Sequence, residues 1–319
     1  VQLDADWNEW LAILDRRRRT ATADGLGAAA ISPLTPEAFR IQVSGGALTI
    51  GAGRLYLDGY LAENFGAGPD AFDAAFENLR GTDPLPFADQ PFRPGLTPPA
   101  PEAGRHLVYL DVWRRTVTHL QDPALIEPAL GVDTTARTQT VWQVRTLAVG
   151  SDVTCATAPE DIAGWPALTP PSAARLTTRN VTAPDPEDPC LLPPGAAYRG
   201  LENRTYRVEI HDRDADGRWR FKWSRDNATV ATAVTTVETL SRLVVAAVAR
   251  DDVKRIEAGD WVEVTDDRLE LETIPAPLRR VLSVDDGTGL VELETALPGG
   301  TFAVAGDGTP SRHLRVVKW

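Results

Sequence analysis

The segment 211–217, with the sequence HDRDADG, has residue types and spacing that could bind a metal. Asp212, Asp214 and Asp216 occupy alternate positions and are followed by Gly217. Carboxylates at this spacing, followed by a turn glycine, form the first half of an EF-hand calcium loop. Such a loop needs a bidentate carboxylate at its twelfth position, which is Trp223 here. The second half of a calcium loop is therefore missing.

The residues on either side of this segment alternate between polar and apolar. Segments 205–211 and 218–224 both have the period of two that is typical of β-strands. Asp and Gly are also turn residues, and glycine accepts the positive φ that a tight hairpin requires. The pattern favours a hairpin tip. The alternative is a weak calcium site that another loop completes, and calcium is the one cofactor that we consider.

Other catalytic patterns are weak. His211 and Asp212 are adjacent, so in a regular strand they would point to opposite faces and could not form a direct pair. The chain has no nucleophile elbow, no Walker A loop and no dinucleotide-binding loop after a strand. Carboxylates paired in space for glycoside hydrolysis remain an alternative, with these members: Asp111, Glu127, Asp133 and Glu209. We favour exposed or turn positions for them and assign no catalytic residue.

The two cysteines, Cys155 and Cys190, lie at the two ends of a Pro- and Ala-rich segment. Two thiols alone cannot form a tetrahedral zinc site. A disulfide between them would close a loop of roughly 35 residues and add about 3–4 kcal/mol in the loop-entropy model. The alternative is a pair of unbonded small core residues, and the sequence does not decide between the two.

An amphipathic helix is expected at the start of the chain. Trp7, Trp10, Leu11 and Leu14 have the spacing of one helix face, and we interpret them as a docking stripe for a partner or as an internal core face. Asp6 is expected to cap the helix, and Gly25 to end it.

Beyond residue 36 the pattern changes to short β-strands separated by Gly- and Pro-rich turns. We expect a mainly β protein with antiparallel sandwich or barrel modules and long Pro-rich loops. The predicted parts are an N-terminal helix and linker (1–36), a first β-rich domain (37–153), a Pro-rich loop (154–197) and a second β-rich domain (198–319). The unpatterned stretches 82–105 and 154–197 are interpreted as arms that bind neighbouring subunits.

Composition narrows the functional classes. Of 319 residues, 43% are hydrophobic and the formal net charge is -12, so a packed core is expected and nucleic acid is not the expected partner. No apolar run is long enough for a membrane span. The 9 tryptophans could be core residues, sugar-stacking platforms or subunit anchors. Because the chain lacks Met, even at position 1, we expect it to be part of a longer protein.

Four phrases of the sequence are distinctive as a set. They are VQLDADWNEW (1–10), LTIGAGRLYLDGYLAEN (48–64), EPALGVDTTARTQTVWQVR (127–145) and YRGLENRTYRVEIHD (198–212) with FKWSRDNATV (221–230) downstream. Together they resemble an uncharacterised bacterial family found in phage-tail-like proteins. In that family a right-handed β-helix often follows, and a shorter turn commonly replaces DRDADG. The resemblance implies no catalytic residues.

The resemblance, the β-rich pattern and the helix together predict a structural protein of a phage tail or contractile injection particle. The expected place is near a baseplate or fibre, and the expected partners are other subunits and copies of the chain in a trimer or hexamer. Such a protein would assemble in the bacterial cytoplasm and then belong to an extracellular or virion-like particle. The alternative function is a carbohydrate-binding or carbohydrate-active β-protein that recognises a surface glycan.

Overall fold

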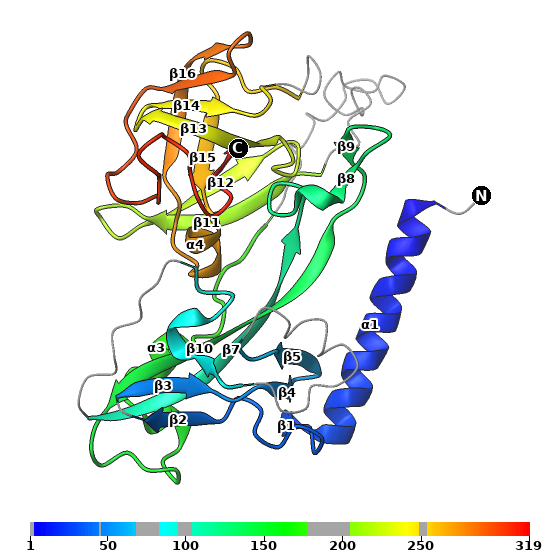
Figure 1. The fold of residues 1–319 in the computed structure, drawn as a ribbon, viewed down its shortest axis with the longest axis vertical. Coiled ribbons are helices and arrows are strands. Elements are labelled where there is room, and N and C mark those ends of the chain that lie inside the picture. Colours follow the sequence, from blue (N-terminus) through cyan, green and yellow to red (C-terminus); the bar gives the residue numbers. More distant parts are fainter. Residues whose placement is uncertain (1–2, 45, 68–82, 95–103, 178–204, 249–253) are drawn as a thin grey trace, which may run out of the picture.

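The fold is mainly antiparallel β, as the sequence predicted, in a computed structural model that describes residues 3–44, 46–67, 83–94, 104–177, 205–248 and 254–319. Figure 1 shows a first β module, a barrel module beyond it, and one long helix that stands along the side of the molecule. None of the described helices is long and apolar enough to cross a membrane.

Helix α1 (Asp4–Leu26) begins two residues before the predicted cap. Leu3 is the N-cap, and Asp6 is the third helical residue, whose carboxylate accepts a hydrogen bond from the Leu3 backbone N–H at 3.0 Å. The predicted N-cap was therefore wrong, because Asp6 is the third helical residue, which in a capping box bonds back to the N-cap. In the sequence, an acidic residue at that position resembles the N-cap itself. Gly27, rather than Gly25, ends the helix with a φ of 83°.

The first module contains two small sheets and one long ribbon. Strands β1 (Ala29–Ile31), β4 (Gly53–Leu57) and β5 (Tyr60–Asn64) form one sheet, and β2 (Ile41–Ser44), β3 (Ala47–Ile50) and β6 (Leu85–Pro86) form the other. Strands β7 (Arg105–Val117) and β10 (Arg137–Val149) pair over 13 residues without a register shift. The ribbon extends from this module toward the barrel (Figure 1).

Trp142 of β10 lies at the centre of the first module. Its ring is buried and makes edge-to-face contacts with Phe39 and Phe92, while its indole N–H donates to the Glu63 carbonyl at 2.7 Å. The short helix η1 (Phe87–Asp89) adds Phe87 to this core. The described part of the stretch 82–105 therefore packs on the module and does not extend as an arm.

Short elements follow the two ribbon strands. After β7 come η2 (Pro123–Leu125) and the small pair β8 (Ile126–Glu127) and β9 (Val132–Asp133). After β10 come η3 (Pro159–Asp161) and α3 (Trp165–Leu168), where Ile162 is buried. The rest of the predicted second arm, 178–197, lies outside the described residues.

The second module is a closed six-stranded antiparallel barrel in the order β13-β14-β17-β16-β15-β18. Its strands are β13 (Ala231–Thr239), β14 (Arg242–Val245), β15 (Trp261–Thr265), β16 (Leu278–Asp285), β17 (Leu290–Leu293) and β18 (Arg315–Lys318). Alternating aliphatic residues of these strands, such as Leu243, Val262 and Val316, fill the interior. Helix α4 (Asp267–Leu271) follows β15.

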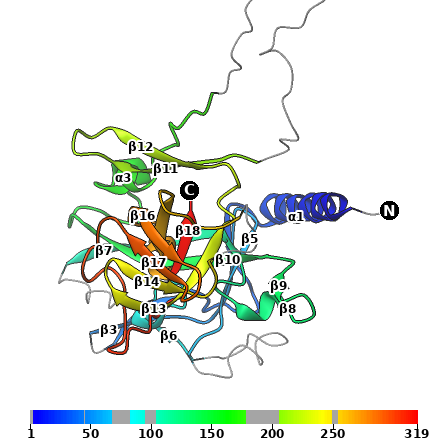
Figure 2. The same ribbon diagram turned by 90° about the horizontal axis from the view of Figure 1, so that it is seen from above.

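A separate hairpin lies over the barrel. Strands β11 (Arg207–Arg213) and β12 (Trp219–Ser224) pair only with each other among the described strands. Figure 2 shows this hairpin above the barrel strands, with its tip on the side away from α1. A two-stranded hairpin is marginally stable on its own, so its contacts with the barrel matter for its position.

Candidate functional site

The predicted docking stripe lies on the surface of α1. Trp7 and Trp10 are 50% and 49% exposed, and Leu11 and Leu14 are similarly open. The two indole rings contact each other, with centroids 5.2 Å apart. No described residue of α1 is buried, so within this chain the stripe is not a core face. We call these four residues the α1 stripe.

Only the second half of α1 is tied to the body among the described contacts. The Asp15 carboxylate accepts two hydrogen bonds of 2.6 Å from Arg114 of β7, which lower the pKa of Asp15. The Arg19 guanidinium lies over the Tyr60 ring, 3.9 Å from its centroid. At 100° per residue, the α1 stripe is about a third of a turn away from these body-facing residues. The helix therefore presents its apolar residues to solvent.

Of the three aspartates, Asp214 and Asp216 lie in the hairpin tip, and Asp212 lies near the end of β11. One Asp214 carboxylate oxygen accepts hydrogen bonds from the backbone N–H groups of Asp216 and Arg218, at 3.0 and 2.8 Å. Gly217 has a φ of 78°, as the turn requires. Asp212 bonds to Arg220 across the strands, which lowers the pKa of Asp212. In the part of the chain that the structure describes, no group of three or more potential ligands could hold a metal.

The inner face of the hairpin meets the barrel through a buried polar cluster. The Lys222 ammonium lies 2.6 Å from both carboxylate oxygens of Glu263, which is 8% exposed on β15. The indole N–H of Trp319 donates to the same carboxylate at 2.9 Å, and Lys222 lies 4.0 Å from the centre of that ring. Glu209 adds a second anion 3.4 Å from Lys222. These contacts hold the hairpin on the barrel.

His211 belongs to the same inner face because the strand is not regular there. A register shift between Ile210 and Asp212 turns His211 toward Glu263, and its Nδ1 lies 4.0 Å from a carboxylate oxygen. Burial, and then the positive charge of Lys222, lower the pKa of His211. The imidazole is therefore neutral near pH 7 and is part of the hairpin's attachment to the barrel.

The outer face of the hairpin is apolar and open to solvent. Trp219, Phe221 and Trp223 are 59%, 63% and 53% exposed. Opposite them in register lie exposed Val208 and Ile210, and the ring of Tyr206 stacks on Trp223. We call this set of six residues the outer face: Tyr206, Val208, Ile210, Trp219, Phe221 and Trp223. The strand tryptophans thus divide between a core position at Trp142 and exposed positions on the hairpin.

A groove of about 1220 Å³ runs between β12 and the barrel. Trp223 lies on the hairpin side of the groove, Trp261 and Trp319 lie on the barrel side, and Arg279 and Pro298 also contribute to its wall. The Trp261 side chain is half exposed. Aromatic rings beside a few polar groups are the usual lining of small-molecule binding grooves.

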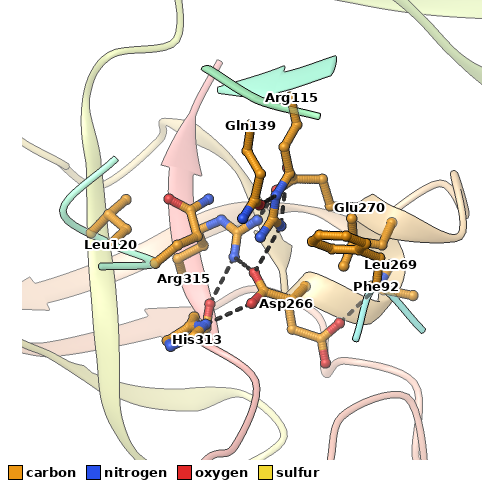
Figure 3. Close-up of polar contacts among 12 residues, drawn as sticks. Phe92, Arg115, Leu120, Gln139, Asp266, Leu269, Glu270, His313 and Arg315 are labelled. Atoms are coloured by element: carbon orange, nitrogen blue, oxygen red, sulfur yellow. Dashed lines mark hydrogen bonds and ion pairs between the residues drawn. The ribbon is translucent and has the colours of Figure 1, made fainter. Parts of the chain in front are cut away.

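The two modules meet at a cluster of ion pairs at α4 (Figure 3). The buried Arg315 of β18 donates to Asp267 at 3.0 Å and also bonds Glu270. His313 lies 2.6 Å from Asp267, and Arg115 of the ribbon approaches Asp267 and Glu270 at 4.0 Å. Just beyond α4, Glu272 pairs with Arg93 and Arg145 of the first module at 3.1 and 3.6 Å. Since cations neutralise these carboxylates, the cluster acts as a structural joint.

The remaining predicted candidates do not form one site. Glu127 and Asp133 lie one register position apart on the paired strands β8 and β9, where neighbouring positions point to opposite faces. Asp133 pairs with His119 at 3.0 Å, Glu209 with Lys222, and Asp111 and Glu127 lie on β7 and β8. Cys155 is exposed, and Cys190 lies outside the described residues, so the predicted disulfide stays a prediction. Sequence inspection missed the Lys222–Glu263 pair and the joint at α4, because their members are about 40 or more residues apart.

The model of one protein family matches residues 1–158 and 168–319, which is nearly the whole chain. The chain belongs to DUF6519, a family of unknown function. No curated protein and no solved structure matches this DUF6519 chain.

Proposed function

We propose that this DUF6519 chain is a structural subunit of a phage tail or phage-tail-like contractile injection particle and that it acts by assembly. The observation that supports an assembly role best is the exposed α1 stripe on a helix whose described contacts with the rest of the chain lie in its second half. Contiguous exposed apolar surface is typical of protein interaction sites. The particle type is proposed from the sequence resemblance.

In this proposal the chain is incorporated near a baseplate or fibre, in the bacterial cytoplasm, before the particle leaves the cell. The α1 stripe contacts a neighbouring subunit, while the barrel holds the hairpin and displays its surface. A trimer or hexamer would match the symmetry of such particles. The chemistry is burial of tryptophan and leucine side chains, so no cofactor is needed for this role.

Co-sedimentation of the tagged chain with particles from its own host tests this function. Trp7→Ser/Trp10→Ser should reduce the chain in the particle fraction at least tenfold. The control Val43→Ser/Leu282→Ser changes two exposed apolar residues away from α1 and should leave incorporation unchanged. Absence of the unmodified chain from every particle fraction would rule out the proposal.

The groove beside β12 supports a second candidate function, the binding of a surface glycan. Trp223 and Trp261 both line it and are half exposed, as stacking platforms for sugars would be. A glycan array tests this candidate. Binding should disappear in Trp261→Ala and persist in Trp219→Ala, which removes an exposed hairpin tryptophan that does not line the groove. Failure of the unmodified chain to bind any glycan would remove the candidate.

A further inference from the structure

The β11–β12 hairpin is inverted relative to an ordinary surface sheet. On its inner face the Lys222 ammonium is turned toward the barrel and neutralised there by Glu263. Its aromatic and aliphatic side chains are turned toward solvent. A half-buried sheet normally places its apolar face on the core. The inversion therefore leaves six apolar residues, the outer face, ready to contact another surface.

The chain carries a second surface that complements the first, the α1 stripe. Residues 4–14 of α1 contain three acidic side chains, Asp4, Asp6 and Glu9, and no basic one. The hairpin 207–224 has five cationic and four anionic side chains, and exposed Arg213 lies over the Trp219 ring at the edge of the outer face. Because Lys222 is neutralised by Glu263, the remaining hairpin charges balance, and the charge complementarity lies between the acidic start of α1 and Arg213 at the edge of the outer face.

The two surfaces also agree in size. From Trp7 to Leu14 the helix rises about 10 Å at 1.5 Å per residue. From Trp219 to Trp223 the strand extends about 13 Å at 3.3 Å per residue. Six aromatic side chains that are half exposed would each hide on the order of 100 Å², and the aliphatic residues add to this, so the contact approaches the roughly 1,000 Å² of a specific interface.

We propose that the α1 stripe of one copy of the chain packs on the outer face of the β11–β12 hairpin in a second copy. This inference rests on the proposed assembly function and deepens it by naming the partner and both contact surfaces. One such contact covers both exposed apolar surfaces. Helix-to-helix and hairpin-to-hairpin pairing would instead need two different interfaces to cover them.

The contact must form between copies, because α1 and the hairpin tip lie on opposite sides of one molecule (Figures 1 and 2). An interface that joins two different surfaces is heterologous, and each added copy leaves one helix and one hairpin unused. The assembly therefore grows into a closed ring or an open chain. A ring of three or six copies would agree with the proposed particle symmetry.

A complementation experiment tests the contact through the solution mass of the purified full chain, measured by light scattering. One variant, Trp7→Ser/Trp10→Ser, loses the helix surface, and another, Trp219→Ser/Phe221→Ser, loses the hairpin surface. Each alone should be a monomer, whereas the unmodified chain and the Val43→Ser/Leu282→Ser control should form larger species. An equal mixture of the two variants should stop at a dimer, because it contains only one competent helix–hairpin pair.

Other outcomes overturn the contact in recognisable ways. Self-association of the hairpin variant alone would indicate helix-to-helix pairing, and self-association of the helix variant alone would indicate hairpin-to-hairpin pairing. A mixture that stays monomeric would also contradict the proposal. Because all four substituted residues are exposed, melting temperatures should match that of the unmodified chain, which excludes unfolding as the cause.

The result is separable from that of the proposed function. If the purified unmodified chain is monomeric at every concentration, the contact between copies is wrong, while co-sedimentation can still show that the chain is in a particle. If the mixture forms the expected dimer but the chain is missing from every particle fraction, the contact stands and the particle role fails.

Discussion

His211, which the register shift in β11 turns toward the barrel, makes the stability of the folded chain depend on pH. Its pKa is lowered by burial and by Lys222 and Arg220, against the opposing charges of Glu263 and Asp212. The unfolded chain therefore binds a proton more readily than the folded chain between the lowered pKa and about 6.5. In that window the free energy of unfolding rises with pH, so this contribution to stability is lost on acidification.

We predict that His211→Gln flattens the pH dependence of stability below about pH 6.5. Urea unfolding at a series of pH values measures the free energy for both proteins. The unmodified chain should lose more stability than the variant as the pH falls. Parallel curves would show that the imidazole remains as easily protonated in the folded chain as in the unfolded one.

Lys222 and Glu263 give a second prediction at the residue scale. Lys222→Met leaves the buried Glu263 carboxylate without its main cation, so the free energy of unfolding should fall by about 3 kcal/mol. Adding Glu263→Gln should recover about 2 kcal/mol, because Trp319 can still donate to the amide oxygen. Urea unfolding of the double-mutant cycle measures both effects.

The exposed pair on the same hairpin is the control for this cycle. Arg220 bonds Asp212 with most of its side chain in solvent, so Arg220→Met should leave the free energy of unfolding nearly unchanged. Equal losses in Lys222→Met and Arg220→Met would contradict a buried ion pair as the attachment of the hairpin.

At the scale of elements, the packing of α1 against the first module depends on one glycine in the β4–β5 turn. Gly59 has a φ of 77°, and a Cβ there would lie 2.3 Å from the Arg19 carbonyl oxygen. Gly59→Ala should therefore displace the second half of α1 from the first module. Trypsin should then cleave within the arginine run 16–19 about tenfold faster, which corresponds to about 1.4 kcal/mol of local opening.

Gly46→Ala is the matched control for the packing of α1 against the first module. Gly46 has a similar φ of 82° but has no atom within 4 Å of the built Cβ. Both substitutions carry the backbone cost of about 1–2 kcal/mol for a left-handed residue, whereas only Gly59→Ala clashes with the helix. The same cleavage rate in both variants would mean that Gly59 does not seat α1.

The elements were largely predictable from sequence because their signals are local. The period of two located β11 and β12 within two residues, and the DADG turn placed the hairpin tip. The side of the hairpin that faces the barrel was not predictable. Alternation gives two faces, and the inward face is polar here because Glu263, 41 residues from Lys222, supplies the partner.

For α1, too, the sequence pattern predicts an apolar face but not what covers that face. The spacing of Trp7, Trp10, Leu11 and Leu14 predicted one apolar face but left open whether this chain covers it. The structure leaves it exposed, because the body contacts lie at Asp15 and Arg19, on another part of the helix surface. Those contacts depend on Arg114 and Tyr60, which are distant in sequence and have no periodic signal.

At the scale of the whole molecule, the two modules are joined by the segment beyond α4. Glu272 pairs with Arg93 and Arg145 of the first module, and the Gln143 amide donates to the Leu271 carbonyl at 3.0 Å. These side chains are largely buried, so they couple the unfolding of the barrel to that of the first module. Such a joint would hold the helix and the hairpin at fixed positions relative to each other, as the proposed contact between copies requires.

We predict that Glu272→Leu separates the unfolding of the two modules. The change leaves two buried guanidinium groups without their carboxylate, which should weaken the joint by about 3 kcal/mol. Differential scanning calorimetry should then resolve two transitions where the unmodified chain has one. Glu294→Leu removes a carboxylate from an exposed barrel pair with Arg280, 3.5 Å apart, and should keep a single transition. The contrary outcome is a single transition in Glu272→Leu, with a melting temperature lowered no further than in Glu294→Leu. The ion pairs would then not couple the modules, and the β7–β10 ribbon would carry that coupling.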